Sequence, residues 1–340
     1  MEIDFSRDGE PVIDFESILP STASDGSVDV VLCGVTLTIR QSSTLGGRVW
    51  AASLSLARRV EKGEIPRWLE REDGAEAEEE KEKEKRVHSR ESPASGVGES
   101  WLKGARAIEL GAGCAGLPSI ALALTHGTRC VLAEHPEEAP LLRENIAAVQ
   151  AQVKALALEG KVSRVAAEAI AAMGVVELDW NDHAGLASVV DAPAGTCASA
   201  GGADGGYDLV VFSDCAYATN HEPLLRAVVA CCGPVGVVLA EESRRSEAVN
   251  EGFLRYFCDP TLFAVMPLDV GDSKTVETRV FLMRWQSESD ARVARSAVAS
   301  GTFVSAANKA GVVEFKEDGK RRKKVSKLAA AAVAPVLMTL

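Results

Sequence analysis

The chain of 340 residues lacks the patterns that mark secreted, membrane-spanning and metal-binding proteins. Its eight cysteines are scattered without a C-x-x-C pair, and its five histidines form no H-E-x-x-H motif, so we expect reduced thiols and no metal site. No apolar segment near the N-terminus has the form of a signal peptide. The longest apolar runs, at residues 227–240 and 328–340, have about 14 and 13 residues, which is too short to cross a bilayer. These absences predict a soluble protein of the cytoplasm.

Positive charge is also scarce, because 37 Lys and Arg residues stand against 49 Asp and Glu residues. The net charge of −12 and the pI near 5.1 argue against general binding to nucleic acid or to an acidic membrane surface. One basic cluster, K-R-R-K-K at residues 320–324, is either a nuclear signal or part of a solvated tail, and we expect the tail. We therefore expect neither nucleic acid nor membrane among the partners.

What the chain does have is a glycine-rich stretch at residues 105–134, around which the rest is organised. Its first six residues are apolar except for Glu109 and lead into Gly111, Gly113 and Gly116. This pattern predicts a buried strand and a tight turn that brings a ligand close to bare backbone. Apolar residues at helical spacing follow, and then a second apolar strand.

Glu134 ends this second strand, 21 residues after Gly113. A carboxylate at that distance is typical of nucleotide folds that bind ribose hydroxyls. The G-x-G-x-x-G pattern alone fits nicotinamide, flavin and methyl-donor binders, or a turn without a ligand. With Glu134 it predicts an adenosine-containing ligand, whose identity must come from the rest of the chain.

Strands and helices continue to alternate along the chain. Further strands are predicted at 174–178, 207–212, 235–240, 262–266 and 279–285, helices at 45–60, 140–149, 151–173 and 224–229, and a hairpin at 28–40. This pattern predicts an α/β fold: a doubly wound, mostly parallel seven-stranded Rossmann-like sheet with an N-terminal β-hairpin extension. We predict an arm at 1–27, one domain at 28–286 with flexible insertions at 70–99 and 191–206, and a poorly ordered tail at 287–340.

Polar residues follow four of these strands at the point where each ends. They are Glu134, Asp179 with Trp180, Ser213 with Asp214, and Glu241 with Glu242. Ligands of doubly wound sheets bind at the carboxyl edge of the strands, so this edge is the predicted active site.

Five short blocks within residues 28–286 carry a family resemblance. They read V-W-A-A-S at 49–53, E-L-G-A-G-C at 109–114 with G-L-P at 116–118, A-E-H-P at 133–136, E-L-D-W at 177–180 and D-C-A-Y at 214–217. In this order they resemble the seven-β-strand, S-adenosylmethionine-dependent protein methyltransferases, in particular the group that methylates lysines of non-histone proteins and carries a D-x-x-Y motif. The family usually reads G-A-G-C-G, and Ala115 departs from this pattern.

The resemblance implies a role for most of these residues. Glu134 would accept the ribose hydroxyls of S-adenosylmethionine, and Trp180 would lie against its adenine. Asp214 and Tyr217 would face the incoming amine as catalytic residues. The implied cofactor-binding residues are Trp50, Glu109, Gly111, Ala112, Gly113, Glu134, Asp179, Trp180 and Ser213.

The implied activity is methyl transfer to a nitrogen of a protein substrate by a monomeric enzyme, with lysine favoured over arginine and histidine. Two alternatives stay open. One is a catalytically silent methyltransferase fold that serves as a binding module, and the other is a nicotinamide-dependent oxidoreductase. The second does not account for Asp-Trp at 179–180 or for D-C-A-Y at 214–217.

Overall fold

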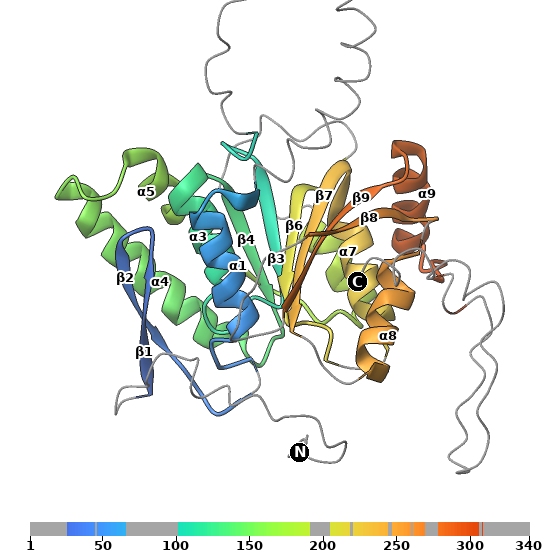
Figure 1. Ribbon diagram of the computed structural model, residues 1–340, viewed down its shortest axis with the longest axis horizontal. Coiled ribbons are helices and arrows are strands. Elements are labelled where there is room, and N and C mark those ends of the chain that lie inside the picture. Colours follow the sequence, from blue (N-terminus) through green and yellow to red (C-terminus); the bar gives the residue numbers. More distant parts are fainter. Residues whose placement is uncertain are drawn as a thin grey trace, which may run out of the picture.

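The computed structural model describes residues 26–44, 46–65, 101–190, 205–217, 220–243, 247–259, 261–268, 278–305 and 308 (Figure 1). Within these residues, a seven-stranded sheet carries helices on both faces, and a two-stranded hairpin lies beside it. The predicted α/β fold is therefore confirmed. No helix of the described part is long and apolar enough to cross a membrane.

The large sheet runs in the spatial order β5-β4-β3-β6-β7-β9-β8. Its strands are β3 (Arg106–Leu110), β4 (Arg129–Glu134), β5 (Gly174–Glu177), β6 (Tyr207–Ser213), β7 (Cys232–Ser243), β8 (Phe263–Leu268) and β9 (Thr278–Trp285). The first five strands in space are parallel, and β9 runs antiparallel to β7 and β8. The central strands are buried on both faces, which explains why they read as nearly continuous apolar runs.

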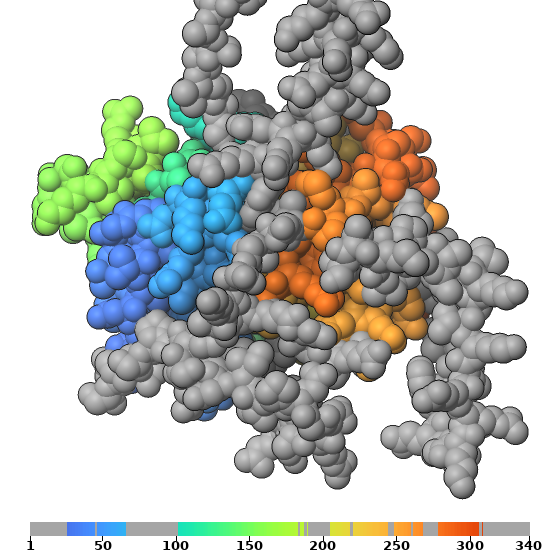
Figure 2. Space-filling view, viewed as in Figure 1, coloured from blue at the N-terminus to red at the C-terminus, as the bar shows by residue number. Residues whose placement is uncertain are grey.

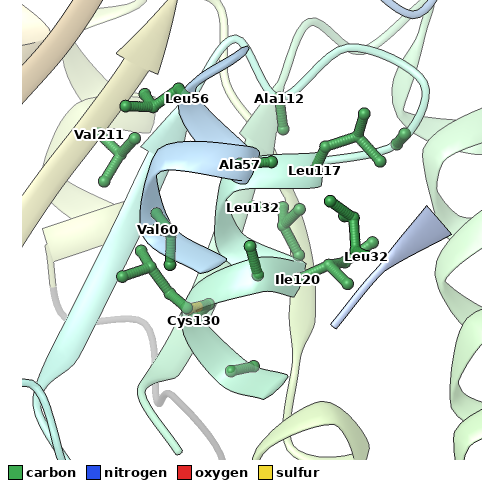
Figure 3. Packing of buried hydrophobic residues seen from close by; sticks show 14 of the residues in the cluster. Leu32, Leu56, Ala57, Val60, Ala112, Leu117, Ile120, Cys130, Leu132 and Val211 are labelled. Atoms are coloured by element: carbon green, nitrogen blue, oxygen red, sulfur yellow. The ribbon is translucent and has the colours of Figure 1, made fainter. Parts of the chain in front are cut away.

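Each face of the sheet has its own hydrophobic core. The first core joins the sheet to α1 (Ala51–Glu61), α3 (Leu117–His126), α4 (Ala139–Leu158) and α5 (Arg164–Ala171). The second joins it to α6 (His183–Val190), α7 (Glu222–Cys231), α8 (Glu247–Phe257) and α9 (Glu288–Ala299). Figure 3 shows the first core, where Ala57 and Val60 of α1 and Ile120 of α3 gather around Cys130 and Leu132 of β4.

The N-terminal hairpin consists of β1 (Ser27–Leu32) and β2 (Val35–Arg40), as predicted. Cys33 and Gly34 both have positive φ, 52° and 73°, which is typical of the two-residue turns that match strand twist. Asn145 of α4 holds the hairpin in place, because its side chain accepts from the Arg40 N–H at 3.0 Å and donates to the Arg40 carbonyl at 2.9 Å. The hairpin thus extends the layer of α1 and α4.

The prediction of a poorly ordered tail beginning at residue 287 is wrong at its start, because α9 packs on α7 and β7. Its Ser287 cap accepts from the Asp290 N–H at 3.1 Å. The buried stripe of α9 is Ala291, Ala294 and Val298, and such small side chains give only a weak apolar signal. The predicted insertion at 70–99, most of the one at 191–206, and the tail from 309 lie outside the described residues.

Candidate functional site

The strand order places the candidate site between β3 and β6. From β3 the chain proceeds to β4 on one side, whereas from β6 it proceeds to β7 on the other. Such a reversal opens a crevice at the carboxyl ends of the two strands, where doubly wound folds bind their ligands. The turn after Leu110 and the loop after Ser213 therefore both lie at this reversal, and we call this edge of the sheet the crevice.

Gly111 opens the glycine turn and brings three parts of the predicted site together. Its φ is +65°, and its N–H donates to the Ala133 carbonyl at 2.9 Å. A Cβ atom at this position would lie 2.6 Å from Cys215 Sγ and 3.2 Å from Trp180 Cζ2. Only glycine fits such an approach, so the turn, Trp180 and the D-C-A-Y block meet here as the sequence predicts.

Glu134 is the last residue of β4, and its side chain contacts the glycine turn. Its Oε2 accepts from the Gly113 N–H at 2.6 Å, and its Oε1 accepts from the His135 N–H at 2.8 Å. Burial raises the pKa of this carboxyl, while the two hydrogen bonds oppose the rise. An ionised carboxylate has about four lone-pair sites, so two remain for a ligand hydroxyl.

Glu109 lies beneath the turn rather than in the crevice. It is 1% exposed, and its Oε2 accepts from the Ser119 N–H near the start of α3 at 3.0 Å. Its Oε1 is buried without a hydrogen-bond partner. Burial raises the pKa of Glu109 to about 7, with the charge of Glu134 adding to the rise. Glu109 therefore supports the glycine turn and α3 from below.

The segment before α1 lies over the glycine turn. A Cβ atom on Gly113 would be 3.5 Å from the Gly46 carbonyl and 3.7 Å from that of Arg48. Trp50 follows directly and is the extended residue before the first turn of α1. The buried ion pair of Arg59 with Glu241, 3.4 Å apart, connects α1 to β7. The position of Trp50 at the border of the site stays a prediction.

Asp179 and Trp180 follow β5 in a polar turn. The Asp179 carboxylate accepts from the backbone and the side chain of Asn181, at 2.8 and 3.0 Å, and these bonds lower its pKa. Trp180 is half-buried and packs against the second core. The edge of its indole ring lies beside Gly111.

Ser213 and Asp214 end β6, and the D-C-A-Y block at 214–217 forms the loop that follows, which we call the acceptor loop. Asp214 is 7% exposed and has φ +54°, an uncommon conformation for a residue with a side chain. Its carboxylate accepts from the backbone N–H and the hydroxyl of Ser243, at 2.9 and 3.0 Å. Tyr217 at the end of the loop is 47% exposed.

Glu242 is a site residue for which the sequence analysis assigned no role. Its two carboxylate oxygens accept from the N–H groups of Cys215 and Ala216, both at 3.1 Å. Its neighbour Glu241 points to the other face of the sheet and accepts from the Thr278 hydroxyl at 2.6 Å. In the sequence, the pair Glu241-Glu242 follows an apolar strand, and this pattern could have indicated a site residue. Which of the two side chains points to the acceptor loop is visible only in the folded chain, because successive residues of a strand point to opposite faces of the sheet.

Cys215 lies against Gly111 of the glycine turn and is buried. Its Sγ donates to the Leu110 carbonyl at 3.3 Å. Burial raises its pKa well above the usual value, and the charges of Glu242 and Glu134 raise it further. A protonated thiol is a poor nucleophile, so Cys215 joins the two loops by packing.

Neither protein-family models nor curated protein sequences match this chain. Among solved structures, a candidate transferase from Pyrococcus horikoshii aligns with TM-score 0.38 and 13% identity over 77% of this chain and 72% of its own. MtNAS, solved with MTA and tNA, aligns with TM-score 0.34 and 14% identity, and the chain spans 55% of its length. Precorrin-6y C5,15-methyltransferase from Geobacter metallireducens gives TM-score 0.34 and 14% identity over 56% of this chain and 84% of its own. At these scores, fold and site are assigned from the chain's own strand order and side chains.

Proposed function

We propose that this protein is an S-adenosylmethionine-dependent methyltransferase that methylates a side-chain nitrogen of a protein substrate, with lysine as the acceptor. The observation that carries the proposal is the meeting of the glycine turn, Glu134, Trp180 and the acceptor loop at one sheet edge. The protein substrate and the choice of lysine rest on the D-x-x-Y resemblance. The chain is proposed to act as a monomer in the cytoplasm.

The side chains of the crevice fit the adenosine part of this cofactor. Glu134 keeps lone pairs for ribose hydroxyls after accepting from Gly113 and His135. Trp180 would cover the adenine, and the backbone of the glycine turn would approach the methionine part. When bound, the cofactor supplies a methyl group on a positively charged sulfur.

In methyl transfer, a protein mainly has to position the acceptor amine relative to the methyl group, and the acceptor loop would do this. An in-line displacement needs the acceptor amine held and aimed, and fixed side chains reduce that entropic cost. A free lysine amine has a pKa of about 10.4 and attacks only after losing its proton. Asp214 and Tyr217 would hold the amine beside Ser213, and removal from water would favour its neutral form.

The test is transfer of a labelled methyl group from S-adenosylmethionine into a cell lysate, followed by mass spectrometry of the labelled protein. We expect methyl groups on lysine from the wild type and a rate roughly 100-fold lower from Asp214→Ala and Tyr217→Phe. Cofactor affinity should stay nearly constant in both variants. Full activity in both would remove these residues from the mechanism, and the absence of transfer by the wild type would favour a silent binding module.

A further inference from the structure

The acceptor loop begins with a residue in an uncommon backbone conformation. Asp214 has φ +54°, a left-handed backbone conformation that is uncommon for a residue with a side chain. Such a residue keeps this conformation only when its surroundings hold it there. Several of the holding contacts come from the last three residues of β7, beginning with the Glu241 carbonyl, which accepts from the Asp214 N–H at 2.9 Å.

Ser243 binds the side chain of Asp214 at both oxygens. Its N–H donates to Oδ1 at 2.9 Å and its hydroxyl donates to Oδ2 at 3.0 Å. Ser243 is 4% exposed, so no solvent competes for these bonds. The two contacts fix the plane of the carboxylate.

Glu242 binds the backbone of the same loop. Its carboxylate accepts hydrogen bonds from the N–H groups of two consecutive residues, Cys215 and Ala216, each at 3.1 Å. Glu242 is 7% exposed, and bonds from N–H groups to an ionised carboxylate are stronger than bonds to neutral acceptors. Without this carboxylate, two N–H groups in a buried loop would lose their acceptor.

We infer that Glu242 and Ser243 are positioning residues for the methyl-transfer reaction: they hold the acceptor loop so that Asp214 and Tyr217 meet the substrate amine. This inference rests on the proposed function. Neither residue needs to touch the substrate, because each acts through the loop. A displacement of about 1 Å in such a loop can lower turnover on the order of 100-fold.

The variants are Glu242→Gln, Glu242→Ala, Ser243→Ala and Ser243→Thr. Gln keeps one acceptor oxygen and Thr keeps the hydroxyl, so each should act better than its Ala counterpart. A small cavity of about 10 Å³ beside Glu242 and Ser243 leaves some room for the added methyl of Thr. Glu251→Gln is the matched control, since Glu251 is an exposed acid on α8.

We expect kcat to fall about 10–100-fold in the two Ala variants. The dissociation constant of S-adenosylmethionine should change less than about threefold, and partial recovery should appear in the Gln and Thr variants. The amide proton signals of Cys215 and Ala216, followed by NMR, should move upfield in Glu242→Gln as the charged acceptor is lost. Glu251→Gln should match the wild type.

Wild-type turnover in all four variants would overturn the inference and leave the proposed function intact. A parallel loss of cofactor binding, melting temperature and kcat would also overturn it, because that pattern indicates a merely structural role. A wild type that binds the cofactor and transfers no methyl group would instead refute the proposed function.

Discussion

At the residue scale, the site depends on carboxylates that bind backbone N–H groups. Glu134 accepts from Gly113 of the glycine turn and from its neighbour His135, and Glu242 accepts from two N–H groups of the acceptor loop. Side chains placed in this way are oriented before any ligand arrives. The sequence identified Glu134 from its spacing, whereas the contact between Cys215 and Gly111 was not predictable because it joins residues more than 100 positions apart.

Glu134→Ala is expected to weaken S-adenosylmethionine binding by roughly 1.5–3 kcal/mol, about 10- to 150-fold, the loss typical of a hydrogen bond to a charged group. Calorimetric titration of the variant measures this directly. Glu134→Gln keeps one acceptor oxygen for the Gly113 N–H, so it tests the loss of the charge with the turn still held. Glu137→Ala, at an exposed position, is the control. Unchanged affinity in folded Glu134→Ala would mean that this carboxylate serves the turn alone.

Glu109 makes stability depend on pH. Burial raises its pKa from 4.5 to about 7, so the folded protein keeps this proton when the unfolded chain has lost it. The contribution of Glu109 to the free energy of unfolding therefore falls as pH rises from about 4.5 to about 7 and stays low above that range.

Glu109→Gln removes this titration and keeps the shape of the side chain. The variant should be more stable than the wild type by about 1–3 kcal/mol at pH 8 and nearly equal to it at pH 4.5. Urea denaturation of both proteins at the two pH values gives the comparison. An equal stability difference at both values would show that Glu109 has the same pKa in the folded and the unfolded chain.

At the element scale, the segment after α9 is attached to the second core through Glu222. This carboxylate is 6% exposed and accepts from the N–H of Ser305 at 3.2 Å, from its hydroxyl, and from the Asn308 side chain at 3.0 Å. The hydroxyl of Tyr256 of α8 lies within hydrogen-bond distance of the side-chain oxygens of both Asn220 and Asn308, at 3.2 and 3.1 Å. Sequence periodicity cannot reveal such an attachment, since it is made by single polar residues in irregular backbone.

Ser305→Ala is expected to lower the free energy of unfolding by about 1–2 kcal/mol, because it removes one donor from a buried carboxylate. Ser300→Ala, at the exposed end of α9, should change it by less than about 0.5 kcal/mol. Chemical denaturation monitored by circular dichroism separates the two. Equal stability of the two variants would mean that the segment around Ser305 adds little to the fold.

At the scale of the whole molecule, alternation of strands and helices was enough to predict the sheet, since buried parallel strands read as apolar runs of characteristic length. All seven strands and the hairpin lie where the pattern places them. The same reasoning missed α6, α8 and α9. The buried face of α9 is made of small residues, and the large buried residues of α8 all lie in its last five positions. Strand ends indicate a candidate site because the topology brings them to one edge of the sheet, whatever the loops between them do.

The most direct test of the account is calorimetric titration of the purified chain with S-adenosylmethionine, its demethylated product and NADH. The crevice of Gly113, Glu134 and Trp180 predicts binding of both sulfur compounds with a dissociation constant on the order of micromolar, and no binding of NADH. Tight binding of NADH, with no heat from either sulfur compound, would contradict the methyltransferase assignment.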